Sequence, residues 1–282
     1  MRKELLFAVL LSLSLSSCSS GDEDIREVTT TVNNNDGDLM PARILKLILG
    51  FDEGDPVASD YYQLFTYNSQ RKVIKVDREH SNQLSPVYLN LNYSGSTVTV
   101  ENRSYDLNVI TPKNTTVYTL NNNGKVIEKY VPSISFNGQV TYGSRKYYYE
   151  YDGQNKLQKV ILKYPDIVPG TPSYPYLKEL ERVDLFFYEG NNLKRIVSQS
   201  AGGYNSNSNI KRETVFSDYD MAKNPFKKLE LIEFYFYRSL SENNYRNMKI
   251  YNYDEDGTKT LFSEQGWNFR YDQNNQLLIS DY

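Results

Sequence analysis

The 282-residue sequence predicts an all-β protein, an antiparallel hairpin or meander array. Three observations support this fold class: segments in which polar and apolar residues alternate, short turns rich in Asp, Asn and Gly between them, and recurrence of this unit along the chain. The sequence contains 26 Tyr, 12 Phe and 1 Trp. Because Tyr favours strands and adds apolar area with a polar end, the composition indicates a sheet with thin or partly exposed cores.

Residues 1–17 have the pattern of a secretory signal. A positive start at residues 1–3 precedes an apolar run over residues 5–15, which is too short to span a membrane. The run ends in Leu15-Ser16-Ser17-Cys18, which resembles the bacterial lipobox. The resemblance implies that residues 1–17 are a lipoprotein signal peptide and that Cys18 receives lipid. The alternative is an ordinary signal peptide with an incidental Cys.

Residues 18–40 are expected to form the lipidated Cys and a flexible polar tether. Ser19, rather than Asp, follows the Cys, which by resemblance to Gram-negative lipoproteins implies the outer membrane. Asp22-Glu23-Asp24 resembles the acidic segment by which surface lipoproteins of the Bacteroidota are exported. We therefore expect a lipid-anchored outer-membrane protein that faces the cell exterior. If the acidic residues are only a solvated spacer, a periplasm-facing orientation stays open.

Residues 41–282 are expected to form a single β-hairpin-repeat domain. In each unit a strand ends in an aromatic or apolar residue, a polar turn follows, and a Val or Leu comes shortly after it. The units start at Tyr67, Tyr93, Leu120, Tyr151, Tyr188, Tyr253 and Tyr271. Asp, Asn and Gly tolerate the positive φ values of tight turns, and hairpins gain stability by pairing side by side. The pattern leaves open whether the sheet stays extended or curls.

These units resemble the YD-type repeats of Rhs-like proteins, in which hairpins wind into a curling sheet. The whole chain is similar to lipoproteins of the Bacteroidota that carry such repeats after a lipobox, a family without an established activity. Residues 219–226, followed by residues 241–244, look like the connector of those proteins. The spacing of the units is uneven in this chain, so the resemblance does not imply a regular spiral.

One short helix is expected within residues 226–240. Apolar residues recur there at helical spacing, at Leu229, Ile232, Phe236 and Leu240. The run Phe234-Tyr235-Phe236-Tyr237 also fits a strand. We favour the helix.

The composition excludes several kinds of site. One Cys cannot form an intramolecular disulfide, a Cys-rich zinc site or an iron–sulfur cluster, and one His excludes every two-His metal motif. No metal and no cofactor are therefore expected. A net charge of -3 argues against a nucleic-acid partner. His80 has no accompanying nucleophile motif, so we interpret it as a solvent-facing loop residue rather than a general base.

The aromatic segments are the best candidates for a binding site. Alternation places Tyr147, Tyr149 and Tyr151 on one face of a strand, and it does the same for Trp267, Phe269 and Tyr271. Sugars have apolar faces that stack on such rings. The alternative is that these rings are cross-strand pairs and core.

The sequence therefore predicts a non-catalytic lipoprotein with no catalytic residues. Its expected partners are the membrane, through the N-terminal lipid, and a glycan or an envelope or host protein. One alternative is a periplasm-facing structural or assembly lipoprotein. Another is a hydrolase built on a carboxylate pair, which would need two acids about 5–10 Å apart in a cleft.

Overall fold

The computed structural model describes residues 31–32, 39–52, 55–80, 83–106, 115–136, 139–166, 181–200, 210–271 and 273. The first strands are β1 (Thr31–Val32), β2 (Leu39–Met40), β3 (Arg43–Asp52), β4 (Asp55–Tyr67), β5 (Val73–His80), β6 (Gln83–Leu84), β7 (Val87–Ser94), β8 (Thr97–Ser104), β9 (Thr115–Leu120) and β10 (Val126–Val131). They are followed by β11 (Ile134–Phe136), β12 (Gln139–Tyr142), β13 (Arg145–Tyr151), β14 (Leu157–Lys163), β15 (Glu181–Glu189), β16 (Asn192–Ser200), β17 (Ile210–Tyr219), β18 (Tyr245–Tyr253) and β19 (Lys259–Gly266).

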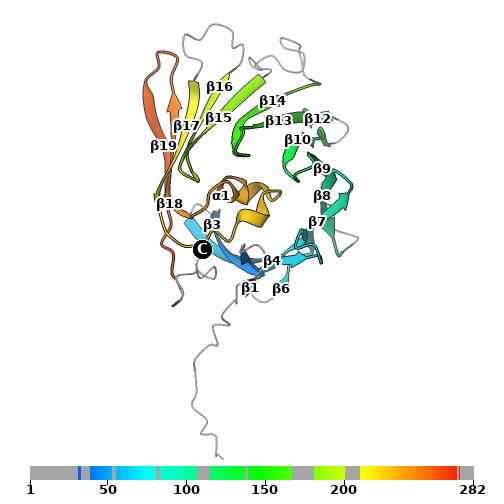
Figure 1. Ribbon diagram of the computed structural model, residues 1–282. Helices are drawn as coiled ribbons and strands as arrows, with labels where there is room; N and C mark the ends of the chain where they lie inside the picture. The colour runs from blue at the N-terminus through cyan, green and yellow to red at the C-terminus, as the bar shows by residue number, and fades with distance from the viewer. Residues whose placement is uncertain are drawn as a thin grey trace, which may run out of the picture.

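One antiparallel sheet of 15 strands dominates the described residues. Its order runs from β19 back to β3 almost entirely in chain sequence, while β11 with β12 and β1 with β2 form separate pairs. Figure 1 shows this sheet curling around the segment between β17 and β18. The predicted hairpin meander is confirmed, and the sheet curls rather than lying flat. The described residues include no helix that is long and apolar enough to cross a membrane.

Three turns of the repeat share one geometry, at residues 68–72, 121–125 and 152–156. In each, Oδ1 of the first residue, an Asn or Asp, accepts hydrogen bonds from the backbone N–H groups two and four positions later. The fourth residue lies in the left-handed region, with φ of 63° at Arg71, 76° at Gly124 and 60° at Asn155. The Asx side chain thus holds a turn that the backbone alone would disfavour.

The segment between β17 and β18, residues 220–244, is the connector. It contains the 3₁₀ turns η1 (Lys227–Leu229) and η2 (Glu233–Tyr235) and the single-turn helix α1 (Phe236–Ser239). The expected helix is present, but its first part is 3₁₀, because backbone N–H groups there bond to carbonyls three residues earlier. That period aligns Phe226, Leu229, Ile232 and Tyr235, and all four are buried.

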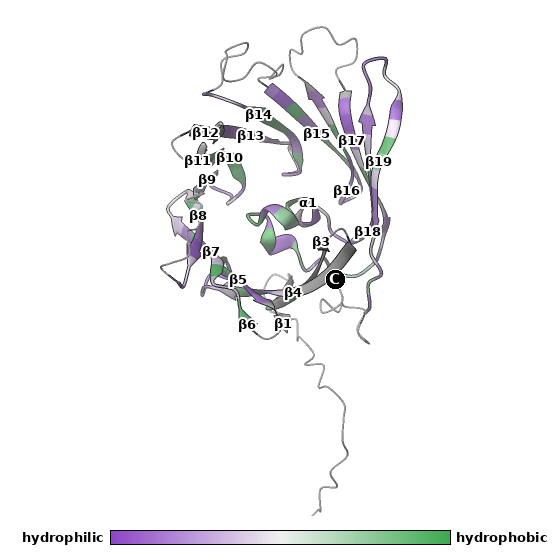
Figure 2. Cartoon of the chain, turned by 180° about the vertical axis from the view of Figure 1, so that it is seen from behind, coloured by the Kyte–Doolittle hydropathy of each residue, from purple (hydrophilic) through white to green (hydrophobic). Residues whose placement is uncertain are grey.

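The connector supplies the centre of the core. Phe226, Leu229 and Tyr235 pack with buried residues of β3 to β5 and β7 to β10 in a first cluster. Phe236 and Leu240 pack against a second cluster, formed by β14 to β18. Figure 2 shows the connector's apolar segments in green inside the curl. The connector therefore packs against the core residues of both halves of the sheet.

The outer face of the sheet carries cross-strand ion pairs. Lys146 lies 3.1 Å from Glu128, Lys163 lies 3.1 Å from Glu181, and Lys249 lies 3.2 Å from Glu264. Lys and Glu are rarely buried, so this face is built for contact with water.

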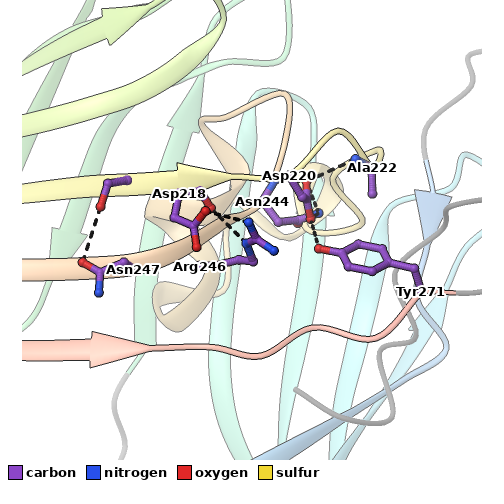
Figure 3. Close-up of polar contacts among 8 residues, drawn as sticks. Asp218, Asp220, Ala222, Asn244, Arg246, Asn247 and Tyr271 are labelled. Atoms are coloured by element: carbon purple, nitrogen blue, oxygen red, sulfur yellow. Dashed lines mark hydrogen bonds and ion pairs between the residues drawn. The ribbon is translucent and has the colours of Figure 1, made fainter.

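The expected half-buried strand over Trp267–Tyr271 is wrong. Strand β19 ends at Gly266, although the Trp267 N–H still donates to the Arg246 carbonyl at 2.8 Å. Beyond this point the side chains pack onto the connector instead. The Tyr271 hydroxyl donates to Asp220 Oδ2 at 2.7 Å, as Figure 3 shows. Ring alternation predicted the buried side correctly, but it does not distinguish a paired strand from an extended chain packed on a neighbour.

Candidate functional site

A cavity of about 220 Å³ lies between the inner face of the sheet and the connector. Its aromatic lining is Tyr118, Tyr147, Tyr149, Phe186, Phe236 and Tyr237, and its charged lining is Lys129, Arg182, Asp184, Glu230 and Glu233. The sheet residues come from β9, β10, β13, β14 and β15. We call this the Asp184 cavity.

Lys129 is held in the aromatic wall by strand register. It pairs with Tyr118 on one side and Tyr147 on the other, so the three side chains share the inner face. Its Nζ lies 5.8 Å from the Tyr118 ring centre and 5.0 Å from that of Tyr147, and 3.3 Å from Glu233 Oε1. Burial lowers the pKa of Lys129, and the Glu233 carboxylate opposes that shift. The result is a buried donor fixed between two rings.

Asp184 is the buried acceptor of this cavity. Its side chain is 7% exposed, and Oδ2 accepts from Arg182 Nη2 at 3.0 Å. Its Oδ1 is buried and has no hydrogen-bond partner within the described part of the chain. A buried carboxylate oxygen without a donor is costly, so such atoms are uncommon. A ligand hydroxyl in the cavity would supply the missing donor.

Two further cavities adjoin this one, of about 310 Å³ and about 210 Å³. All three share Glu233, whose side chain is 84% exposed, so this carboxylate stands at a common mouth. The larger neighbour is lined by Trp267 and Arg212, and the smaller by Arg145. Together they form a line of hollows along the inner face of the sheet.

The cavity's ionisable neighbours have shifted pKa values. Burial raises the pKa of Glu230, while Lys125 at 3.8 Å opposes the shift. Burial also raises the pKa of Tyr237 to about 12 and raises the pKa of Tyr149. The tyrosine hydroxyls therefore stay neutral, available as hydrogen-bond donors, at neutral pH.

The structure places the predicted ligand-binding residues in different surroundings. Tyr147 and Tyr149 line the Asp184 cavity, where the Tyr149 ring meets Phe236 edge-on at 5.9 Å. Trp267 lines the adjoining cavity of about 310 Å³, and Cζ of Arg238 lies 4.3 Å from the centre of the Trp267 ring.

The other predicted rings have structural contacts. The Tyr151 hydroxyl donates to the Val126 carbonyl at 2.9 Å, while Phe269 and Tyr271 pack against the first core cluster. The first predicted aromatic group therefore lies on β13, and the second lies on the extended segment that follows β19.

Sequence reasoning missed the charged residues of this site. Asp184 stands in the apolar run Val183-Asp184-Leu185-Phe186, in register with the inward-facing Phe186. A carboxylate at an inward position of a strand was the available signal. Lys129 gave the same signal two positions before Val131, which is buried.

The remaining predicted positions are the lipidation site, the acidic segment and His80. Cys18 and the acidic segment Asp22–Asp24 lie outside the described residues. His80 is the last residue of β5 rather than a loop residue, because its backbone pairs with Gln83. Across the described ranges, no group of three His, Cys, Asp or Glu side chains could hold a metal ion.

No protein-family model matches the chain, and no curated protein matches it. Two similar solved structures are porin-like proteins. The one from Bacteroides uniformis ATCC 8492 has 12% identity and a TM-score of 0.49, over 84% of this chain and 87% of that one. The one from Bacteroides vulgatus ATCC 8482 has 11% identity and a TM-score of 0.44, over 83% and 88%.

Proposed function

We propose that this chain is a lipid-anchored, non-catalytic outer-membrane protein that binds a glycan in the Asp184 cavity. The observation that carries the proposal is the unpartnered, buried Oδ1 of Asp184 in a cavity walled by tyrosine rings. The lipid anchor rests on the resemblance of residues 15–18 to a lipobox.

The chemistry of the cavity suits a sugar. Rings such as Tyr147 and Tyr149 match the apolar face of a pyranose, Asp184 Oδ1 accepts from a hydroxyl, and Lys129 donates to another. A volume of about 220 Å³ is below the roughly 300–1,000 Å³ of sites for drug-sized ligands. A single sugar unit fits that scale, and the adjoining cavities offer room for its neighbours in a chain.

A glycan screen of the purified mature protein tests this function. Asp184→Asn keeps the shape of the side chain but removes its charge, so a bound glycan should lose affinity by about tenfold. Asp152→Asn is the matched control, because Asn occupies the same turn position at residues 68 and 121. A screen in which no glycan binds, or an Asp184→Asn variant that binds as well as the wild type, would overturn the proposal.

The orientation at the membrane needs its own experiment. Protease treatment of intact cells should remove the protein while sparing a periplasmic control. Replacing Asp22, Glu23 and Asp24 with Ala should protect it, if the acidic segment directs export. Protection of the unmodified protein on intact cells, lost when the cells are opened, would instead favour the periplasm-facing alternative.

A second candidate, a carboxylate-pair hydrolase, is favoured by Glu230. Burial raises the pKa of Glu230, which lines the same cavity as Asp184, and a general acid beside a carboxylate requires two such acids in one cleft. Incubating each bound glycan with the protein and measuring reducing ends separates the two functions. Hydrolysis that Glu230→Gln abolishes while binding persists would establish the hydrolase. Binding without hydrolysis would support the non-catalytic binding function and exclude the hydrolase.

A further inference from the structure

A second and larger hollow, of about 620 Å³, lies between the connector and the rim of the sheet that bears the repeat turns. Its cationic lining is Arg71, Lys72, Lys125, Lys156, Lys227 and Lys228, and its acidic lining is Glu230 and Glu242. Six cations thus face two carboxylates in a chain whose net charge is -3. We call this the rim hollow.

The repeat itself produces this concentration of charge. Lys72, Lys125 and Lys156 each occupy the last position of one of the three equivalent turns. The Nζ of Lys72 lies 5.0 Å from the Tyr93 ring centre, and that of Lys156 lies 5.7 Å from the Tyr188 ring centre. In both cases the ammonium rests over the tyrosine of the next hairpin. Each such turn therefore contributes one cation to the same rim.

The two carboxylates of the hollow do not cancel its positive charge. Glu230 lies 3.8 Å from Lys125, itself one of the six cations, and burial raises the pKa of Glu230, which favours its neutral form. Glu242 Oε2 accepts from Asn191 Nδ2 at 2.7 Å. Lys227 and Lys228, on the connector, face the rim lysines across the hollow. The electrostatic field of the hollow is consequently positive, and a concave site concentrates such a field.

The spacing of the lysines indicates an extended ligand. Lys125 precedes β10 and Lys156 precedes β14, two strands apart, which corresponds to roughly 10 Å along the rim. Lys72 precedes β5, four strands from β10, or roughly 20 Å. A single small anion can contact only one of these lysines. A long ligand with anionic groups at intervals can contact all three.

The chain enters the fold beside this hollow. The Tyr67 hydroxyl donates to the Pro41 carbonyl at 2.8 Å, and Arg71 Nε lies 2.9 Å from Met40 Sδ. A flexible tether of the length predicted here spans roughly 25 Å. The end of the predicted tether, at residue 40, therefore lies beside the hollow.

We propose that the rim hollow binds a multiply anionic saccharide, through phosphate, sulfate or carboxylate groups on successive sugar units. Amide side chains in the lining, from Gln70, Asn155 and Asn191, suit the hydroxyls between those groups. The same chemistry occurs in free polysaccharides and in the anionic headgroups of a membrane. This site is distinct from the Asp184 cavity, with which it shares Glu230 and Phe236.

The test compares two soluble probes that differ only in charge, dextran sulfate and dextran. The mature protein should bind dextran sulfate, with an affinity that falls as salt is added, and should not bind dextran. The triple variant Lys72→Gln, Lys125→Gln, Lys156→Gln should lose at least about tenfold in affinity. The control triple variant Lys146→Gln, Lys163→Gln, Lys249→Gln removes the same charge from the outer face and should bind as the wild type does.

A second arm separates the two sources of the ligand. Vesicles of phosphatidylcholine with phosphatidylglycerol present anionic phosphate at a membrane, and vesicles of phosphatidylcholine alone are their control. If the protein binds dextran sulfate but not the vesicles, the ligand of the site is a free polysaccharide. If it binds both, and the triple variant of Lys72, Lys125 and Lys156 loses both, the site also binds anionic membrane headgroups. Binding to neither probe, or equal losses in both triple variants, would overturn the site. Asp184→Asn should leave this binding unchanged, so the two proposals fail separately.

Discussion

The tyrosines of the repeat do more than fill the core. Several tyrosines, three of them in the repeat, donate their hydroxyl to a backbone carbonyl earlier in the chain: Tyr67 to Pro41, Tyr93 to Val73, Tyr151 to Val126 and Tyr219 to Leu193. In the last three, the acceptor lies at the start of the strand that follows a turn. The bond therefore fastens each hairpin to its neighbour, which explains a preference for Tyr over Phe at this position.

Tyr151→Phe should destabilise the protein by about 1 kcal/mol, because it removes the 2.9 Å bond to the Val126 carbonyl and keeps the ring. Urea unfolding at neutral pH measures the difference. Tyr130→Phe, on the outer face of β10, is the control and should change stability by less than about 0.5 kcal/mol. Equal effects of the two substitutions would show that the repeated hydrogen bond does not fasten the hairpins.

At the scale of elements, one carboxylate links the edge strand β19 to strands beyond its direct neighbour. Glu213 of β17 accepts from Lys259 of β19, from the Tyr253 hydroxyl of β18 at 3.0 Å and from Arg195 of β16 at 3.3 Å. Burial alone would raise the pKa of Glu213, but the hydrogen bonds from Lys259 and Tyr253 outweigh it, and the pKa is lowered. One side chain thus connects four neighbouring strands.

Glu213→Gln should cost about 1–3 kcal/mol of stability at neutral pH, since several bonds to the charged form are weakened together. A carboxyl whose pKa is lowered by folding stabilises the fold above its unfolded pKa, and this contribution is lost as the pH falls through the folded pKa. The gap between variant and wild type should therefore close in acid, as urea unfolding at a series of pH values would show. Glu189→Gln, at a side chain 76% exposed, is the control and should show no such gap. A gap that stays constant with pH would assign the loss to shape rather than charge.

The elements differ in how far the sequence predicts them. Turns and strands were predictable because alternation and Asx residues act locally, within one hairpin. The Asp184 cavity was not, because its lining joins β9, β10, β13, β14 and β15 to a connector some 40 or more residues later in the chain. Tyr147 and Tyr149 were found through their strand pattern. Lys129 and Asp184 can be identified as site residues only from their burial, and that burial depends on how the sheet curls.

On the scale of the whole molecule, a curled sheet leaves an interior that hairpins alone cannot fill. The connector fills it, with Tyr235 fully buried and its hydroxyl donating to Gln63 Oε1 of β4. Tyr235 also stacks on Phe226 at 5.4 Å and meets Phe65 at 6.0 Å. Since the next residue, Phe236, packs against the other core cluster, this short segment couples the two halves of the sheet in addition to the pairing of β10 with β13.

Tyr235→Ala should therefore destabilise both halves together, by about 3–5 kcal/mol, because it opens a large cavity in the first cluster and removes the support of the adjoining Phe236, which packs against the second. Hydrogen exchange followed by mass spectrometry distinguishes the halves. Strands β4 to β10 and strands β14 to β18 should lose protection to the same extent, as expected if the connector makes the fold one cooperative unit. Met221→Ala, at a side chain of the same connector that is 89% exposed, is the control and should leave both halves protected. If β14 to β18 kept full protection in the Tyr235 variant, the halves would be independent, and a ligand in the Asp184 cavity could then order one of them without the other.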